Sequence, residues 1–420
     1  MTTLGDIVEF QRGYDITKNI QSTGTIPVVS SSGINSYHNE YKVKGPGVVI
    51  GRKGTLGTVF FVKGNYWPHD TTLYVKDFKG NDPKFIYYFL KTLPIKRLDV
   101  GSANPTLNRN YLHLMKAHVP SLANQKSIAA ILTAIDSKIE LNNRINAELE
   151  VMAKLIYDYW FVQFDFPISK EQARAMGNPK LEGKPYKASG GKMVWNQELK
   201  REVPEGWEAK KLHEFVPVAT ETIAPNQFPD QVFKHLSIPS FDEVGGYKAE
   251  KGDTIMSNKF LIREFDVLVS KLNPWFNRVV YASKDADLVS STEFVVWRPA
   301  GRLLKNYLYF LARTESFISY CTRSAAGTSN SHKRVNPTVM MRYEVAFNET
   351  VSHDFGTKVE PILKKQFLNQ QENRKLSEFR DWILPMLMNG QVSIKDLPTN
   401  FSDPEFAGEE LSSNLTMLDR

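Results

Sequence analysis

Two loops rich in amide and guanidinium groups are the parts of this sequence best suited to contacting a nucleic acid. They span Asn104–Arg109 and Ser329–Arg334, at corresponding places in the two halves of the chain. Asn side chains can pair with the edge of adenine, and Arg side chains with the edge of guanine, through two hydrogen bonds each. We therefore expect DNA contacts from these side chains: Asn104, Asn108, Arg109, Ser329, Ser331, His332, Lys333 and Arg334.

A second group of candidates lies in shorter polar loops. The stretch 51–57 is rich in glycine but lacks the Gly-x-x-x-x-Gly-Lys-Ser/Thr order of an ATP site. It could bring basic side chains to DNA phosphates or guanine edges, or be a hairpin turn with solvated charges. The serine-rich stretch 30–38 offers hydrogen-bond donors but also fits a plain polar turn. The DNA-binding candidates from these loops and from the matching part of the second half are Ser31, Asn35, Arg52, Lys53, Lys271, Asn273, Asn277 and Arg278.

One short motif raises the alternative of an enzyme. Asn273-Pro274-Trp275-Phe276 approaches the Asp/Asn-Pro-Pro-aromatic motif of DNA adenine methyltransferases, but Trp275 stands where the second proline belongs. A Gly-rich strand-to-helix turn for S-adenosylmethionine does not precede it. The single cysteine, Cys321, excludes an internal disulfide and a Cys-based zinc site, and we expect it to be a small buried hydrophobe. We expect no catalytic residue, no metal site and no cofactor.

The elements that would position these loops occur twice. Pieces of the chain correspond in order at a spacing of about 220 to 228 residues: Val48–Ile50 with Val267–Val269, Tyr88–Leu90 with Tyr309–Leu311, and Asn108 with Asn336. Each copy opens with short β-type runs, 26–30, 47–51 and 58–62 in the first and 266–270 and 279–282 in the second. A short amphipathic helix follows (85–93; 305–320), and then a long helix. The period is too long for a solenoid, so it indicates two copies of a whole domain.

Each long helix carries a heptad pattern. In the first, a-type positions are Ile128, Ile135, Asn142, Leu149 and Ile156, and d-type positions are Ile131, Lys138, Ile145, Met152 and Tyr159. In the second, a-type positions are Ile362, Asn369, Leu376 and Ile383, with Phe379 and Met386 at d. We expect Asn142, Asn369, Leu149 and Leu376 to pair the helices, since a buried Asn at an a position fixes register. Pro361 and Pro385 would kink or end the second helix, and two solvated asparagines are the alternative.

The expected fold class is α+β, with two similar target-recognition domains joined by two long antiparallel coiled-coil helices. The expected division is 1–120 for the first domain, 121–163 for the first helix and 164–203 for a Lys-, Gly- and Pro-rich linker. The second domain follows at 204–352, the second helix at 353–390 and a frayed tail at 391–420.

The charge of the chain is moderately basic. The formal net charge is +7; residues 1–120 hold 15 Lys and Arg against 8 Asp and Glu, and residues 204–352 hold 18 against 17. We expect the first domain to bind DNA phosphates more strongly than the second domain does. The sequence lacks a secretory signal and an apolar run of membrane-spanning length, which predicts a cytoplasmic protein with no membrane partner.

Taken in order, several motifs resemble those of type I restriction-modification specificity subunits over nearly the whole chain. They are Leu4–Ile7, Tyr66–Thr72 and Gly101–Asn108 in the first half, and His235–Asp242, Val269–Pro274 and Gly327–Val335 in the second. The resemblance implies a non-catalytic subunit that reads a split, asymmetric sequence in double-stranded DNA, one half per domain. It implies two methyltransferase subunits as partners, and restriction subunits in the full complex. A methyltransferase-like enzyme and a non-catalytic coiled-coil scaffold are the alternatives.

Overall fold

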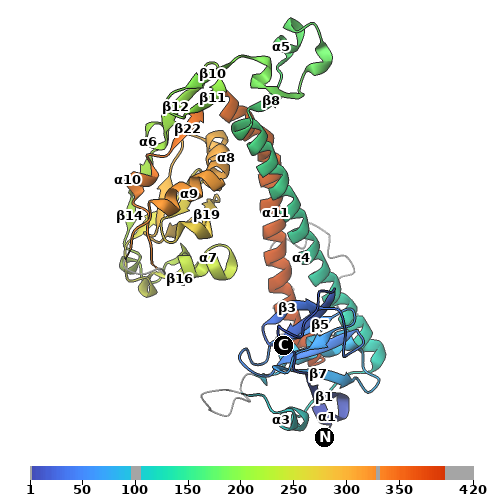
Figure 1. The fold of residues 1–420 in the computed structure, drawn as a ribbon. Helices are drawn as coiled ribbons and strands as arrows, with labels where there is room; N and C mark the ends of the chain where they lie inside the picture. The colour runs from blue at the N-terminus through green and yellow to red at the C-terminus, as the bar shows by residue number, and fades with distance from the viewer. Residues whose placement is uncertain (1, 96–105, 328–331, 393–420) are drawn as a thin grey trace. The chain divides into compact units, whose positions relative to one another are not determined.

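The structure is a computed structural model that describes residues 2–95, 106–327 and 332–392. The chain divides into two compact units (Figure 1). One comprises residues 1–144 and 368–420, and the other comprises residues 145–367. Both long helices, α4 (Leu122–Tyr157) and α11 (Glu349–Met388), pass from one unit into the other. The described part of the chain contains no helix that is long and apolar enough to cross a membrane.

The globular part of the first unit is built on two small sheets. Its elements are α1 (Leu4–Ile7), β1 (Glu9–Arg12), β2 (Ile26–Ser30), β3 (Gly33–His38), β4 (Gly47–Gly51), β5 (Val59–Val62), β6 (Trp67–Pro68), β7 (Thr72–Asp77), α2 (Pro83–Thr92) and α3 (Arg109–Leu114). One sheet has the order β1-β7-β4-β5 and the other the order β3-β2-β6. The fully buried β4 is the apolar run that the sequence predicts as a strand. Phe85 and Phe89 of α2 join β4 and β7 in one hydrophobic core, which also takes in Ile383 of α11.

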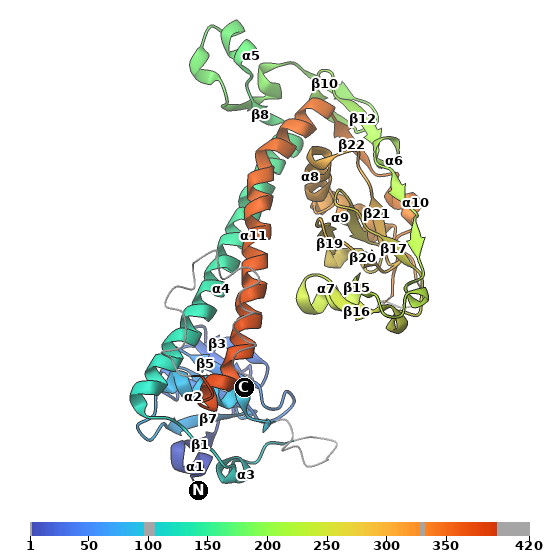
Figure 2. The ribbon, with the colours of Figure 1, turned by 180° about the vertical axis from the view of Figure 1, so that it is seen from behind.

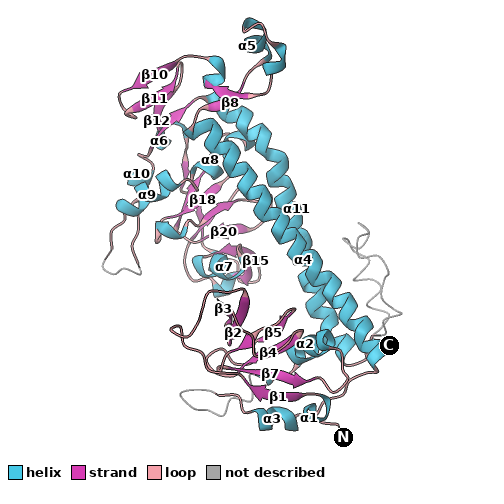
Figure 3. Cartoon of the chain, turned by 45° about the vertical axis from the view of Figure 1, so that its right-hand side comes forward, coloured by secondary structure: helices cyan, strands magenta, loops and turns pink. Residues whose placement is uncertain are grey.

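The second unit holds the other globular domain and the segment that leads into it. Its elements are β8 (Asp165–Pro167), α5 (Lys170–Ala175), β9 (Pro185–Lys187), β10 (Met193–Asn196), β11 (Arg201–Pro204), β12 (Glu208–Lys211), α6 (Leu212–Phe215), β13 (Val218–Ala219), β14 (Thr222–Ile223), β15 (Val232–Leu236), α7 (Ile238–Val244), β16 (Lys248–Lys251), β17 (Lys259–Leu261), β18 (Val267–Ser270), η7 (Pro274–Phe276), β19 (Val279–Tyr281), β20 (Leu288–Ser290), β21 (Phe294–Trp297), α8 (Arg302–Leu311), α9 (Glu315–Arg323), α10 (Pro337–Met340) and β22 (Glu344–Phe347). Figure 3 distinguishes its helices from its strands.

The two domains share one topology. The order β13-β21-β18-β19 repeats β1-β7-β4-β5 strand for strand. The other sheet of the second domain, β14-β17-β20-β15-β16, contains a run that repeats the β6-β2-β3 order. Within it, β15 pairs parallel with β20 and antiparallel with β16, as β2 does with β6 and β3. The internal repeat in the sequence therefore reflects a duplicated domain.

Two sequence-based expectations need correction in this unit. The helix expected over 305–320 is two helices, α8 and α9, because Thr314 caps a new start by accepting a hydrogen bond from the backbone N–H of Phe317 (3.3 Å). Residues 164–203, expected to be a solvated linker, are folded. They carry two small antiparallel sheets, β8-β9 and β10-β11, and bury Phe164 and Val203. Their polar composition concealed a few well-placed apolar residues.

The two long helices run antiparallel, as expected, and lie side by side (Figure 2). In the first unit Asp136 accepts a bond from Arg380 (2.9 Å) and Asn142 donates to Asn373 (2.9 Å), so numbers fall along α11 as they rise along α4. In the second unit the Gln366 side chain donates to the backbone oxygen of Asn146 (3.0 Å). Helix α11 begins at Glu349, four residues earlier than expected, because Asn348 accepts from the backbone N–H of Val351. Pro361 and Pro385 lie within it.

The a-type positions of the heptad face the seam, but the expected d-type positions are wrong by one residue. Asn142 and Asn369 are 2% and 1% exposed, and Leu149 and Leu376 are half-buried. Lys138, Met152 and Tyr159 are exposed. The other set of seam residues lies four residues after each a-type position, whereas the expected d-type residues lie three after it. A heptad alternates steps of three and four residues, and spacing alone does not show whether the step of three or the step of four follows the a-type position. The buried or half-buried residues there include Leu132, Ile139, Asn146 and Ala153 in α4, and Val359, Gln366, Asn373, Arg380 and Leu387 in α11.

Candidate nucleic-acid interface

The main candidate loops lie at equivalent hairpins in the two domains. In the first, residues 52–58 connect β4 to β5; in the second, residues 271–278 connect β18 to β19. Arg52 donates its backbone N–H to Thr71 and accepts from Leu107 (2.8 and 2.9 Å). Lys271 makes the same two bonds, to Glu293 and from Val335 (2.9 and 3.0 Å). Each domain therefore holds one basic residue at the root of its hairpin. The backbone of that residue is bonded on one side to the segment of Thr71 or Glu293 and on the other to the segment of Leu107 or Val335.

The Arg52 guanidinium has an unusual environment. Its Nη1 atom is buried and has no hydrogen-bond partner among the described residues. Burial lowers the pKa of Arg52, the nearby Arg12 lowers it further, and Asp70 opposes both. A guanidinium carries five N–H donors, and a buried donor without an acceptor is costly. An acceptor from a bound molecule would relieve this cost, which makes Arg52 the strongest base-contact candidate in the first domain. Lys53 beside it is exposed.

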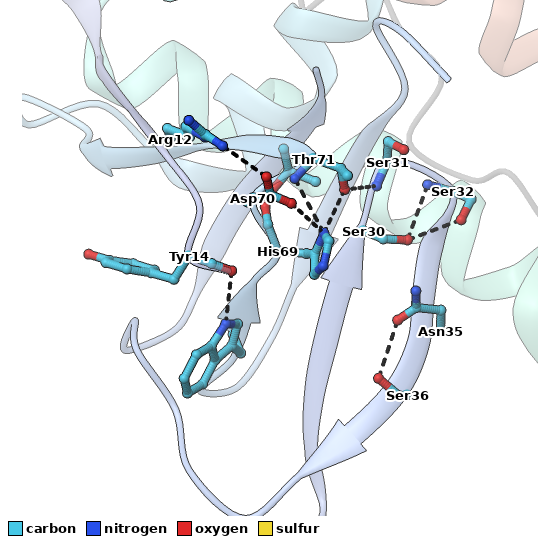
Figure 4. A network of polar contacts seen from close by, with 12 residues as sticks. Arg12, Tyr14, Ser30, Ser31, Ser32, Asn35, Ser36, His69, Asp70 and Thr71 are labelled. Atoms are coloured by element: carbon cyan, nitrogen blue, oxygen red, sulfur yellow. Dashed lines mark hydrogen bonds and ion pairs between the residues drawn. The ribbon is translucent and has the colours of Figure 1, made fainter. Parts of the chain in front are cut away.

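A polar network surrounds the root of this hairpin (Figure 4). Arg12 forms an ion pair with Asp70 at 2.8 Å, and His69 Nδ1 lies 3.0 Å from the Thr71 hydroxyl. Thr71 also accepts the backbone N–H of Ser31 (3.3 Å). Ser31 is 9% exposed, whereas Asn35 is exposed and its side-chain oxygen accepts from the Ser36 hydroxyl (3.3 Å).

Asp15, His69 and Asp70 form the group whose ligand atoms come within 4.8 Å of one another in the described residues. Asp70 is bound to Arg12, and its carboxylate is therefore already neutralised by a guanidinium. Metal ions compete poorly for such a carboxylate, and we assign this group to the polar network. Arg12 and Asp70 were missed as site residues, because their partnership joins positions far apart in the sequence.

Three residues of the loop 104–109 are expected to contact DNA: Asn104, Asn108 and Arg109. Asn104 lies outside the described residues. Asn108 caps α3, where its side chain accepts from the backbone N–H of Asn110 (2.9 Å). Asn336 caps α10 in the same way through Thr338 (2.8 Å). The matching asparagines therefore have a structural reason to recur, because each caps a short helix. Arg109, the first residue of α3, is exposed.

Three candidates of the second domain have internal partners. Arg278 is 9% exposed and donates twice to Asp242 (2.6 and 2.7 Å), which lowers the pKa of that carboxyl. Arg334 donates to both carboxylate oxygens of Glu293 at 3.0 to 3.2 Å. Asn273 accepts the backbone N–H of Lys333 (3.0 Å). The sequence could not reveal these partners, which hold all three side chains in place in the unbound chain.

The remaining candidates of the second domain divide by exposure. Ser329 and Ser331 lie outside the described residues. His332 is exposed, and Lys271 and Lys333 are half-buried. The Asn277 Oδ1 atom is buried without a hydrogen-bond donor from the described residues. The backbone of Lys333 is bonded to Asn273, so this loop meets the β18–β19 hairpin.

The motif that raised the possibility of a methyltransferase lies at the tip of this hairpin. Asn273 through Phe276 connect two antiparallel strands, β18 and β19. The S-adenosylmethionine-type site would require a parallel strand, a Gly-rich turn and a crossover helix. The local topology therefore opposes the enzyme alternative.

Comparison with known proteins identifies type I specificity subunits among the relatives of this chain. Residues 1–151 match the family model for the type I restriction modification DNA specificity domain. The type I restriction enzyme MjaIX specificity subunit of Methanocaldococcus jannaschii is 23% identical over 328 residues, which cover 75% of this chain and 70% of that protein. The C-terminal part of a type I specificity subunit from Mycoplasma pneumoniae is 30% identical over 125 residues, covering 30% of this chain and 84% of that sequence.

A solved structure shares the fold. The type I restriction-modification S subunit from M. genitalium superimposes with a TM-score of 0.60 at 12% identity, over 92% of this chain and 95% of that one.

Proposed function

Because the chain belongs to the type I restriction-modification specificity subunits, we propose that each of its two domains reads one half of a split, asymmetric DNA target. Subunits of this family recognise DNA and are not catalytic. The observation that carries the proposal is the pair of equivalent hairpins. The same backbone frame presents Arg52 and Lys53 in one domain and Lys271 in the other. One frame with different side chains suits two unlike half-sites.

The residues proposed to meet DNA are those that remain accessible or lack an internal partner. In the first domain they are Asn35, Arg52, Lys53 and Arg109, and in the second Lys271, Asn277, His332 and Lys333. Arg52 is proposed to read a guanine edge, since its guanidinium fork can bond O6 and N7 together. The lysines are proposed to hold phosphates, which fixes position without reading sequence.

The family implies methyltransferase and restriction subunits as partners, and we propose two methyltransferase subunits. Helix α4 leaves Met152, Leu155 and, in the turn that follows it, Tyr159 exposed by 40 to 53%. Asn142 and Asn369 are equivalent positions of the internal repeat. By the same separation, the equivalents of Met152, Leu155 and Tyr159 in α11 are Phe379, Trp382 and Met386.

Trp382 is 37% exposed, and Phe379 and Met386 are half-buried. Both helices thus carry apolar side chains at matching positions, of which Met152, Leu155 and Trp382 are among the exposed ones. Exposed apolar faces of this kind are characteristic of protein docking sites, and two of them support two copies of one partner.

Exchange of one domain tests the two-reader proposal. Residues 1–120 would be replaced by the first domain of another specificity subunit with a known target, and modified bases would be mapped in the host. We expect one half of the target to change and the other to stay. A change in both halves, or in neither, would contradict the proposal.

A further inference from the structure

Two aromatic side chains at the tip of the β18–β19 hairpin are exposed to solvent. Trp275 and Phe276 are 39% and 57% exposed, and their ring centroids lie 5.9 Å apart with the planes inclined at 45°. Single exposed apolar residues are common on protein surfaces. Two adjacent large rings at the tip of a hairpin are less easily explained by folding, because neither adds its full area to the core.

The tip is held rigidly. Asn273 and Asn277, on either side of η7, both adopt the left-handed backbone conformation (φ 47° and 49°), which asparagine tolerates better than most residues. The Asn273 backbone N–H donates to the Lys333 carbonyl (2.7 Å), and its side chain accepts in return. Pro274 between them is buried and fixes its own φ. Rings on such a turn lose little freedom when they bind a partner.

The base of the tip supports Phe276 from one side. The guanidinium carbon of Arg278 lies 4.5 Å from the centroid of the Phe276 ring, and Arg278 is itself fixed by two hydrogen bonds to Asp242. A cation stacked on a ring face covers that face. The exposed fraction of Phe276 therefore lies away from Arg278, where a second flat group can stack.

The equivalent hairpin of the first domain has no such rings. Gly54 and Gly57 provide the positive φ angles there (77° and 73°), and Thr55 and Leu56 occupy the tip. The frame of the hairpin is shared, and the aromatic tip is specific to the second domain. It is therefore not a requirement of the fold.

We propose that Trp275 and Phe276 form a wedge that enters a base step of the second half-site and stacks on the bases it separates. This inference rests on the proposed function, in which the second domain reads DNA. Lys271 lies at the root of the hairpin and the Lys333 backbone is bonded to Asn273 at its tip, so two basic residues of a kind that binds phosphate belong to the segments that meet here. Apolar wedges kink duplex DNA by partly unstacking one step. Pyrimidine–purine steps are the easiest to open, so we expect one at the point of entry.

The test uses the complex with the host methyltransferase subunit and a duplex that carries the motif methylated in the host. Binding of the unsubstituted complex should kink the duplex, measured by energy transfer between dyes at its ends. It should also raise the fluorescence of 2-aminopurine, substituted in turn for each adenine of the second half-site and its flanks, at the opened step. The double variant Trp275→Ala/Phe276→Ala should lose both signals and bind about 10- to 100-fold more weakly.

Two controls separate stacking from damage to the fold. Trp195→Ala removes a 58% exposed indole from β10 and should change neither signal. Phe276→Tyr keeps a stacking ring and should retain the kink. Removing one base at the opened step relieves the need for a wedge and should restore part of the affinity of the double variant.

The remaining outcomes distinguish a failure of the proposed function from a failure of the wedge. If the unsubstituted complex shows no preference for the motif, the proposed function itself fails. If it binds the motif specifically and the double variant kinks and binds it equally well, only the wedge is refuted. If the double variant binds DNA normally but no longer assembles with its protein partners in native mass spectrometry, the rings are a protein-docking site and the wedge is likewise overturned.

Discussion

Replacing Asn142 by leucine tests the polar part of the helix seam. Asn142 is 2% exposed, and its Nδ2 atom donates to Glu372 Oε2 (2.8 Å) and Asn373 Oδ1 (2.9 Å). The heptad predicts that Asn142 and Asn369 both lie in the seam and pair the helices. Both asparagines are buried in the seam, and the two amide hydrogens of Asn142 bond to residues one turn beyond Asn369 along α11.

The expected cost follows from these two bonds. A neutral hydrogen bond contributes about 1 kcal/mol net, and one to a charged group about 1.5–3 kcal/mol. Leucine, which has the same branching but is larger, would recover part of this by burying apolar surface. Glu372 keeps Lys138 at 3.3 Å, and Asn373 keeps Asn143 at 2.8 Å, which limits the loss. We therefore expect Asn142→Leu to lower the free energy of unfolding by about 1–3 kcal/mol.

The assay is urea unfolding of the full chain, with Asn124→Leu as the control, an exposed position in the first turn of the same helix. The control should change stability by less than about 0.5 kcal/mol. The double variant Asn142→Leu/Asn373→Leu should lower the free energy of unfolding by less than the sum of the two single variants. The reason is that both single variants remove the same Asn142–Asn373 hydrogen bond. If the two losses simply add, the asparagines do not act as partners and the seam register is wrong.

Four further predictions follow from the structure. Leu155→Glu and Trp382→Glu should each remove one methyltransferase subunit from the complex in native mass spectrometry; loss of both subunits from one substitution would contradict two separate docking faces. Cys321 is 1% exposed and burial raises its thiol pKa to about 12, so iodoacetamide should label it at the rate of unfolding, and rapid labelling of folded protein would refute its burial. Because Arg278 lowers the pKa of Asp242 in the folded chain, this pair should stabilise the protein above about pH 4 and lose that effect as pH falls further; Asp242→Asn should flatten this part of the stability profile, and an unchanged profile would contradict the ion pair. Inserting four residues at matched places in both long helices lengthens each by about 6 Å, and methylation mapping should then find the same half-sites with about two more base pairs between them.

The fold was largely accessible from the sequence because duplication and heptad spacing are periodic signals. The strands β2 and β4 begin and end where their apolar runs do. The seam phase was not accessible, since Lys138 and Ile139 fit a heptad equally well until the partner helix is present. The folded segment 164–203 was missed because a few buried aromatics, such as Phe164, stabilise an otherwise polar stretch.

The candidate site was harder to predict. Arginines in loops look alike in a sequence, yet Arg278 is fixed by Asp242 while Arg52 keeps a buried nitrogen without a partner among the described residues. Which of them can meet DNA depends on contacts between distant residues. In the sequence, Trp275 and Phe276 of the aromatic tip indicate only an imperfect enzyme motif, because exposure cannot be read from residue type.

The most direct test of DNA specificity is a map of methylated bases across the host genome, compared between cells with the gene deleted and cells in which it is restored. We predict that one split motif, with two unlike halves and an unspecified gap between them, loses methylation in the deletion strain and regains it on restoration. Restoring a version with the changes Arg52→Ala and Lys53→Ala should relax or abolish the half read by the first domain alone. Methylation that is unaffected by the deletion, or a single contiguous motif, would contradict the account.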